Sequence, residues 1–477
     1  MEMALKGSKD YQRSENDHNY SLEKYISLGH VHGLKYLGRK GKFERYFWIS
    51  VLLAMLAFTV YVVFSAITTT PVHLTPRPLN TLPFPAITIC PETKAQKKFA
   101  DFTKAYRIIT NDKSNETLSD EEMPRIEALS QICDPHMLED KKLNEQPTPG
   151  KEFLEILREI SYPNFILFCK YRGIVQGCNE LFKEIVTDDG ICYTFNMLDL
   201  IKSDNNTKAS WSVTNGYENE NFVTYPRRAF SGSDNGMNVV IDIPKTETDY
   251  LCRGPVQGYK LKIHSADEFP VFGYGYQRIP PQKEVLVSVT PEITSLKENC
   301  IDTNEKPLKH FTEYTYKNCM TECLSSFVLS KCGCVKFSMV HENDTEICNQ
   351  HQTSCVSDAF LSFYTSNKFK NEFFCDCKPS CKSLKFKTSV SQSDYNHNRV
   401  FEAYGVDVNE EFPNSQMSRL IVYLEDDFYM TSSNQNYPQE TFIDKIAKIG
   451  GLLAFFLGAS LISFIEIFFY LFKRCFS

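Results

Sequence analysis

The sequence predicts a membrane protein with two transmembrane helices and, between them, a large disulfide-rich extracellular domain of mixed α/β structure. Three observations support this fold class. Two strongly apolar segments lie near the two ends of the 477-residue chain, basic residues lie on the terminal side of each, and 16 of the 17 cysteines lie between Cys90 and Cys381. The lengths of the apolar segments and the positions of the basic residues therefore indicate two transmembrane helices. The cysteines indicate that the region between the helices lies in an oxidising compartment.

The first apolar segment, residues 46–67, contains 22 residues without a charge, enough to cross a hydrocarbon layer of about 30 Å. A signal peptide is the alternative, but the segment is too long for a signal-peptide core and starts far into the chain. The second segment, residues 446–472, is followed by Lys473 and Arg474, whereas a lipid-anchor signal would end in its apolar tail. Cys475 is third from the end, which does not fit a prenylation motif.

Basic residues decide the orientation, because Lys and Arg beside a span stay on the cytoplasmic side. Those before the first segment are Lys35, Arg39, Lys40, Lys42 and Arg45. Between residues 65 and 83 the only Lys or Arg is Arg77. We therefore expect a plasma-membrane protein with both termini in the cytoplasm. The expected parts are a cytoplasmic N-terminus at 1–45, helices at 46–67 and 446–472, an extracellular domain at 68–445 and a cytoplasmic tail at 473–477.

The cysteines indicate the compartment. An even number between the spans predicts full pairing. Zinc binding is the alternative for two close pairs, Cys332/Cys334 and Cys375/Cys377, but a cysteine-dense extracellular segment favours disulfides. Three glycosylation sequons lie in the same segment, at Asn115, Asn205 and Asn343.

Geometry predicts part of the pairing. On a helix, Cys319 and Cys323 would share a face. On a strand, Cys375 and Cys377 would also share a face, at a similar separation. If this helix and this strand run antiparallel, two disulfides can link them side by side. Two further disulfides then join cysteines that lie between them in the sequence. The predicted pairs are Cys319–Cys377, Cys323–Cys375, Cys332–Cys355 and Cys334–Cys348. A row of disulfides of this kind, a disulfide ladder, would make the domain stiff enough to transmit force to the membrane helices. Stabilisation of the folded domain outside the cell explains the same cysteines.

Hydrophobic periodicity predicts the secondary structure between the spans. Residues 84–90 read FPAITIC, and this β-branched run predicts a strand soon after the first span. Alternating segments predict further strands at 236–243, 258–265, 284–293 and 418–430. Apolar residues at three and four spacing predict peripheral helices at 121–132 and 150–160. We therefore expect a central β-sheet with helices on its outside.

Two classes of function are excluded. The net charge of -7 is modest and no block of Lys or Arg dominates a folded region, which argues against nucleic acid as a partner. The chain contains no HExxH, no GxSxG and no phosphate-binding loop, and His341-Glu342 lacks a second histidine. We expect no enzyme, no metal site and no cofactor.

The second apolar segment carries polar residues that a lipid-facing helix avoids. Glu466 costs about 2.5 to 3.5 kcal/mol at this depth on insertion scales, which favours a position facing a pore or another subunit. At about 100° per residue, Ser460, Ser463 and Glu466 fall within roughly a third of the helix circumference. The alternative for Glu466 is snorkelling toward the inner surface or a pairing role between helices.

The run Gly458, Ala459, Ser460 has two interpretations. The simpler one is a small-residue seam for close helix packing. In the other, a helix break here aims backbone carbonyls into a narrow lumen, where they replace the water around a cation. Glu440 and Asp444 at the outer end would then concentrate cations, although neighbouring lysines oppose them. Two helices cannot enclose a lumen, so an oligomer is expected.

Together these residues resemble the degenerin and epithelial sodium channel superfamily, which includes the acid-sensing and peptide-gated channels. The resemblance spans nearly the whole chain. It rests on His32-Gly33 before the first span, the FPAITIC segment, the ten cysteines at 300–381 and the Gly-Ala-Ser run. It implies a trimeric channel with a hand-shaped ectodomain and an amiloride-blockable sodium pore. It also implies a filter at 458–460 and an inner mouth at His32 and Gly33, with Ser463 and Glu466 lining the pore.

The resemblance further implies three disulfides, Cys90–Cys192, Cys169–Cys178 and Cys300–Cys381. Cys133 and Cys252 are then paired by elimination alone. Sodium is the expected permeant ion, and modulation by calcium is kept as an alternative.

Departures from the acid-sensing pattern concern the stimulus. Acid-sensing members carry an Asp where this chain has Phe469 and an acidic residue where it has Lys448. The short tail and the late cysteine spacing are similar to the invertebrate peptide-gated branch, which includes channels opened by neuropeptides ending in Arg-Phe-amide. The expected partners are related subunits in a homo- or heterotrimer, membrane lipid and an extracellular peptide. Gating by protons or by force is the alternative, and a two-span receptor or adhesion protein without a pore is the alternative of another class.

Overall fold

The computed structural model describes residues 41–68, 73–110, 117–133, 143–202, 210–218, 224–296, 298–302, 305–365 and 375–433, together with 447, 449–452, 454, 455, 458 and 465. The chain divides into two compact units. One contains Leu74–Ser433, and the other contains Met1–His73 with Asn434–Ser477. We call them the large unit and the small unit.

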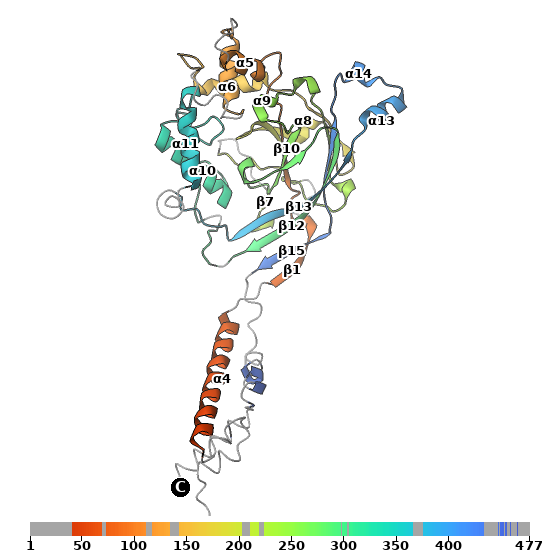
Figure 1. Cartoon of the computed structure of the whole chain (residues 1–477). Coiled ribbons are helices and arrows are strands. Elements are labelled where there is room, and N and C mark those ends of the chain that lie inside the picture. The colour runs from red at the N-terminus through yellow and green to blue at the C-terminus, as the bar shows by residue number, and fades with distance from the viewer. Residues whose placement is uncertain are drawn as a thin grey trace, which may run out of the picture. The chain divides into compact units, whose positions relative to one another are not determined.

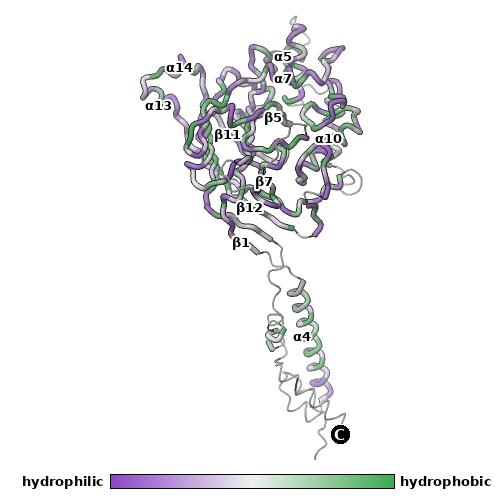
Figure 2. Tube along the Cα trace, turned by 180° about the vertical axis from the view of Figure 1, so that it is seen from behind, coloured by the Kyte–Doolittle hydropathy of each residue, from purple (hydrophilic) through white to green (hydrophobic). Residues whose placement is uncertain are grey.

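The small unit contains helix α4, Lys42–Thr68, which includes the whole predicted first span. At about 1.5 Å per residue its 27 residues extend roughly 40 Å. Figure 2 shows it hydrophobic along most of its length and hydrophilic at its first turn. Most of its described side chains are exposed, and Thr59 bonds within the helix, from Oγ1 to the Met55 carbonyl oxygen at 2.7 Å. An exposed apolar helix with its polar groups satisfied internally is suited to lipid.

Helix α4 is long and apolar enough to cross a membrane, and within the described part of the chain it is the one helix that meets this test. Most of the second predicted span lies outside the described residues. Within it, residues 447, 449–452, 454, 455 and 465 are helical.

The large unit contains two larger β-sheets, not the one central sheet expected from the sequence. The first has eight strands in the order β1-β15-β12-β14-β9-β3-β4, with β13 also paired to β12. Its strands are β1 His73–Pro78, β15 Phe428–Ser433, β12 Lys283–Ser295, β14 Ser418–Leu424, β9 Met237–Ile241, β3 Ile166–Tyr171, β4 Ile174–Val175 and β13 Lys382–Asp394. Figure 1 shows β13, β12, β15 and β1 side by side.

The second sheet has five strands in the order β11-β10-β2-β6-β5. They are β11 Gln277–Ile279, β10 Tyr259–His264, β2 Ala86–Pro91, β6 Gly190–Phe195 and β5 Phe182–Thr187. The FPAITIC segment supplies β2, which is buried along its whole length and pairs with β10 and β6. A small ribbon pairs β7, Trp211–Ser212, with β8, Gly216–Tyr217.

The main hydrophobic core joins the two sheets. One cluster of buried side chains contains Ile87 and Ile89 of β2 together with Val285, Val287 and Val289 of β12. Alternate residues of a strand point to the same face, so the valines of β12 form one apolar row. The predicted strand at 418–430 forms two strands, β14 and β15, because three acidic residues at 425–427 interrupt it.

Helices cover the outside of the sheets. The α-helices are α5 Phe102–Thr110, α6 Glu122–Ser130, α7 Phe153–Ile160, α8 Cys178–Leu181, α9 Tyr250–Arg253, α10 Tyr316–Cys332, α11 Thr353–Thr365, α13 His397–Tyr404 and α14 Val408–Glu411. The 3-10 helices are η1 Leu79–Thr81, η3 Gly150–Glu152, η4 Ser233–Asn235, η5 Lys245–Glu247, η6 Phe272–Tyr274 and η7 Gln350–Gln352. The helices expected at 121–132 and 150–160 form as α6 and α7, which pack in a second core.

Candidate functional site

The residues predicted to line an ion pathway mostly fall outside the described part of the chain. These are Ala459, Ser460, Ser463, Glu466, His32, Gly33, Glu440 and Asp444. Gly458, the first residue of the predicted filter, is described.

The backbone departs from right-handed helical geometry at Gly458. Its φ is +62°, in the left-handed region, and its N–H donates to the carbonyl oxygen of Ala454 at 2.9 Å. Glycine enters this region without the steric penalty that a Cβ causes, and it often ends a helix there. Within the described residues of this segment, the left-handed backbone is thus found at Gly458 itself.

Disulfides reinforce the large unit. The structure forms eight, and they join the same cysteines that the sequence and the resemblance paired. They are Cys90–Cys192, Cys133–Cys252, Cys169–Cys178, Cys300–Cys381, Cys319–Cys377, Cys323–Cys375, Cys332–Cys355 and Cys334–Cys348. The close pairs considered as zinc ligands are thus bonded to other cysteines.

Helix α10 carries one side of the disulfide ladder. It begins after Thr315, whose side chain accepts a hydrogen bond from the Asn318 N–H, and it ends at Gly333, where φ is +72°. Cys319 and Cys323 lie one turn apart on it, as predicted. The strand expected at Cys375 and Cys377 is wrong, because that segment is irregular and β13 begins only at Lys382. Besides the disulfides, hydrogen bonds between the Tyr314 hydroxyl and the Lys378 backbone hold this segment.

Of the three sequons, Asn343 lies within the described residues. It is exposed in a turn after α10, which leaves its side chain accessible. Asn115 and Asn205 lie outside the described residues.

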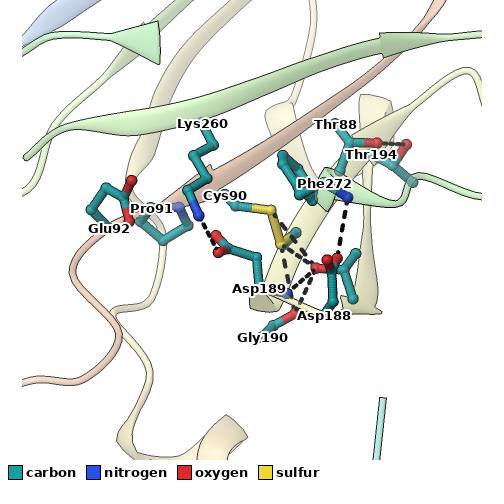
Figure 3. Close-up of a disulfide and its surroundings, with 12 residues drawn as sticks. Thr88, Cys90, Pro91, Glu92, Asp188, Asp189, Gly190, Thr194, Lys260 and Phe272 are labelled. Carbon is teal, nitrogen blue, oxygen red and sulfur yellow. Dashed lines mark hydrogen bonds and ion pairs between the residues drawn. A yellow bond between two sulfur atoms is a disulfide. The ribbon is translucent and has the colours of Figure 1, made fainter. Parts of the chain in front are cut away.

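A buried charge cluster lies beside the Cys90–Cys192 disulfide (Figure 3). Asp189 comes from the turn between β5 and β6 and is only 3% exposed. It accepts hydrogen bonds from the Lys94 ammonium at 2.8 Å, the Arg253 guanidinium at 2.5 Å and the Lys260 ammonium at 2.5 Å. One carboxylate thus connects three segments that are far apart in the chain.

A second carboxylate extends the cluster. Glu92, 2% exposed, accepts from Arg253 Nε at 3.0 Å and from the Arg278 guanidinium at 2.8 Å. Arg253 also donates to the carbonyl oxygen of Ile132 at 2.7 Å, beside the Cys133–Cys252 disulfide. The cluster therefore joins the five-stranded sheet to α9 and to the end of α6.

Burial and ion pairing oppose each other in this cluster. Burial alone would raise the pKa of Asp189, but Lys94, Arg253 and Lys260 outweigh it and hold this pKa at about 2. Burial lowers the pKa of Lys94 to about 8, although Asp189 partly offsets that effect. The adjacent Asp188 carboxylate differs, because burial raises its pKa while it accepts from the Phe272 N–H at 3.3 Å.

A polar junction connects the five-stranded sheet to α10. Asn318 of α10 donates to the carbonyl oxygen of Asp267 at 2.9 Å and accepts from the Phe269 N–H at 2.9 Å. Beside it, Lys317 and Glu268 form an ion pair at 2.5 Å. Helix α10, which is cross-linked by disulfides, is thus hydrogen-bonded directly to the segment that follows β10.

Comparison with known proteins identifies the family. The model of the family described as amiloride-sensitive sodium channel matches residues 25–470, nearly the whole chain. The chain belongs to the amiloride-sensitive sodium channel family. It is therefore an ion-channel protein and not an enzyme.

Relatives cover most of this channel protein. Pickpocket protein 28 of Drosophila melanogaster is 26% identical over 98% of this chain and 82% of its own length. Sodium channel protein Nach of Drosophila melanogaster is 23% identical over 94% of this chain and 86% of its own. Acid-sensing ion channel 2 of Rattus norvegicus is 24% identical over 83% of this chain and 73% of its own. Channels of this family are plasma-membrane assemblies of related subunits.

A solved proton-activated chloride channel aligns with 89% of this chain and 97% of its own at 9% identity and a TM-score of 0.28, which supports no conclusion about fold.

Sequence reasoning missed the buried charge cluster of this channel protein. The Asp-Asp-Gly sequence at 188–190 signals a turn between two strands, and it was the available clue. Lys94, Arg253 and Lys260 are 64 to 95 residues away from Asp189, so no local spacing connects them. The pairing of β10, β2, β6 and β5 brings Asp189, Lys94 and Lys260 together, and α9 adds Arg253.

Asp267 should give the channel a pH-dependent stability. It is buried, and burial, together with Glu268, raises its pKa to about 7. An unfolded aspartate titrates near pH 4, so between about pH 4 and 7 only the folded state holds this proton. The stabilising contribution is complete below about pH 4 and is lost as the pH rises through 7. Asp267→Asn should therefore raise the melting temperature clearly at pH 8 and only slightly at pH 4.5.

Differential scanning fluorimetry of the purified protein at both pH values measures this change. Exposed Asp376→Asn is the control, because its side chain is 77% exposed. Equal shifts for both variants at pH 8, or a destabilised Asp267→Asn protein at pH 8, would contradict the assignment.

Proposed function

We propose that the chain is a subunit of a ligand-gated sodium channel whose second apolar segment lines the pore. What supports this role most directly is the left-handed backbone at Gly458, inside an apolar segment that also carries Ser463 and Glu466. Where a helix is interrupted, its backbone carbonyls are free to coordinate a cation. Gly458, Ala459 and Ser460 would form the filter, and three subunits, identical or related, would enclose the pore.

The gating proposal follows from two neighbouring strands. Strand β1 leads on from α4, and β15 leads toward the second apolar segment. The two are adjacent in the eight-stranded sheet, and β15 pairs with β12 in parallel, with Glu292 opposite Met430. A displacement of β12 would therefore reach the chain leading to both membrane segments. In this proposal the large unit is extracellular, both termini are cytoplasmic, and a ligand on the large unit moves the sheet.

The stiffness of the large unit supports the same proposal. Five disulfides lie in the part of the chain from Cys300 to Cys381, and α10 is anchored to the β10 end through Asn318. A cross-linked element transmits a displacement instead of absorbing it. The ligand proposed from the sequence is an extracellular neuropeptide. Acid is the second candidate stimulus, favoured by the pKa of about 7 at buried Asp267.

Voltage clamp of cells expressing the chain tests the proposal. Amidated peptides, peptides with a free carboxylate and acid are applied in turn, amiloride is added to each response, and sodium is exchanged for potassium or calcium. We expect a stimulus-dependent, amiloride-blocked current that reverses near the sodium equilibrium potential. Co-expression with related subunits addresses a requirement for heteromers. A surface-expressed chain that conducts under none of these conditions, alone or with partners, would favour the receptor or adhesion alternative.

A further inference from the structure

A cavity of about 540 Å³ opens at the β3–β4 end of the eight-stranded sheet, away from the charge cluster and the polar junction. Its lining residues are Tyr171, Arg172, Ile174, Gln176, Thr224, Tyr225, Arg227 and Arg228. A volume in this range matches ordinary small-molecule sites. No carboxylate occurs among these described lining residues, and the guanidinium groups of Arg172 and Arg227 place positive charge in the cavity.

Each guanidinium lies over an aromatic ring. Arg172 is 4.0 Å from the centre of the Phe230 ring, and Arg228 is 3.9 Å from that of Tyr217. Arg227 lies 5.2 Å from the Phe195 ring. A planar guanidinium that stacks through its face keeps its in-plane N–H donors available for an anion. Within the described chain, neither Arg172 nor Arg227 makes an ion pair.

The wall of the cavity is held in place before any ligand arrives. The Cys169–Cys178 disulfide closes the β3–β4 hairpin that carries Arg172. On the other side, the Arg227 N–H donates to Asn196 Oδ1 at 2.6 Å, and Asn196 donates to the Phe84 carbonyl oxygen at 2.6 Å. A fixed wall reduces the ordering cost of binding.

The remaining lining is largely apolar and uncharged. Tyr171 donates its hydroxyl to the Arg228 carbonyl oxygen at 3.3 Å, and Tyr225 donates to the Met197 carbonyl oxygen. Their hydroxyls are thus engaged, and burial raises the pKa of Tyr171, so it stays neutral. The rings and the exposed Ile174 side chain present flat apolar surface.

We infer that this cavity binds a small organic anion, one or two carboxylates on a flat apolar body. The guanidinium groups of Arg172 and Arg227 hold the carboxylates, and the tyrosine rings and Ile174 contact the body. The same charge repels a cationic amidated peptide, so the site is distinct from the peptide site of the proposed function. Binding is measured without current, so its failure would leave the channel proposal standing.

Isothermal titration calorimetry of the purified full-length protein in neutral detergent micelles tests the inference, with naphthalene-2,6-dicarboxylate as the probe. Naphthalene-2,6-dimethanol is the matched neutral compound, and inorganic sulfate is the anion without an apolar body. The variants are Arg172→Gln and Arg227→Gln. The control is Arg399→Gln on α13, where the side chain is 82% exposed.

We expect saturable binding of the dicarboxylate, and about tenfold or greater weakening in each cavity variant, because a hydrogen bond to a charged group is lost. Arg399→Gln should bind as the wild type does, and melting temperatures should show that all variants fold. The inference is overturned by absent or non-saturable binding to the wild type, by equal binding of sulfate or the neutral diol, or by equal loss in the Arg399→Gln control.

Discussion

Replacing Gly458 with valine should abolish selective current while the protein still reaches the cell surface. At φ +62° a side chain with a Cβ is strained, by roughly 1–2 kcal/mol for an ordinary residue and more for a β-branched one. The substitution therefore shifts the backbone toward a continuous helix. The carbonyl oxygens after Ala454 would then accept hydrogen bonds within the helix and would not be available to a cation. Gly458→Ala should have the same direction of effect with a smaller loss of sodium selectivity. Voltage clamp measures current and reversal potential, and surface biotinylation measures delivery.

Gly451 offers a matched control for this prediction. It is a helical residue of the same segment, and a Cβ placed on it meets nothing within 4 Å among the described residues. Gly451→Ala should therefore conduct with unchanged selectivity. If Gly458→Val kept a normal sodium-selective current, the break at Gly458 would not contribute to the filter.

Asp189→Asn should destabilise the large unit by about 3–5 kcal/mol, because it removes the anion shared by buried Lys94, buried Lys260 and partly buried Arg253. Lys94 and Lys260 would each keep a charge without its nearest carboxylate, at distances of 2.8 and 2.5 Å in the native cluster. With a pKa of about 2, Asp189 remains ionised in any ordinary buffer. Its contribution is complete above about pH 4 and is lost as the pH falls through 2. The expected result is a clear fall in the melting temperature at neutral pH and reduced surface expression.

A double-mutant cycle separates charge from packing at Asp189. Lys94→Met in the Asp189→Asn background removes one of the stranded charges, so it should cost less than Lys94→Met alone or even restore stability. Asp394→Asn is the control, because this side chain is 73% exposed and pairs with Lys283. An Asp189→Asn protein that melts like the wild type, or strictly additive effects of the two substitutions, would contradict a role for the buried charge.

Several features of this protein follow from local sequence. Helices α6, Glu122–Ser130, and α7, Phe153–Ile160, form because three-and-four spacing leaves one apolar face to bury. Strands β9, β10 and β12 form because alternation leaves one row of side chains for a core. Strand β2 forms from a β-branched run and is buried along its whole length. Cys319 and Cys323 share a face of α10 because they are four residues apart. Gly458 is the local residue type that permits a left-handed backbone inside an apolar segment.

Other features exist only in the folded chain. Alternation shows which side of a strand is buried, but not which sheet the strand joins, so one sheet was expected where two are formed. The adjacency of β1 and β15, the Asp189 cluster and the arginine-lined cavity all unite residues that lie far apart in the sequence. The spacing of residues within one strand or helix does not show which distant segments of the chain will meet. The sequence by itself determined the membrane segment α4, helices α6 and α7, strands β2, β9, β10, β12 and β14, and the four cysteine pairs of the ladder, whereas long-range packing decided where the charges of the large unit meet.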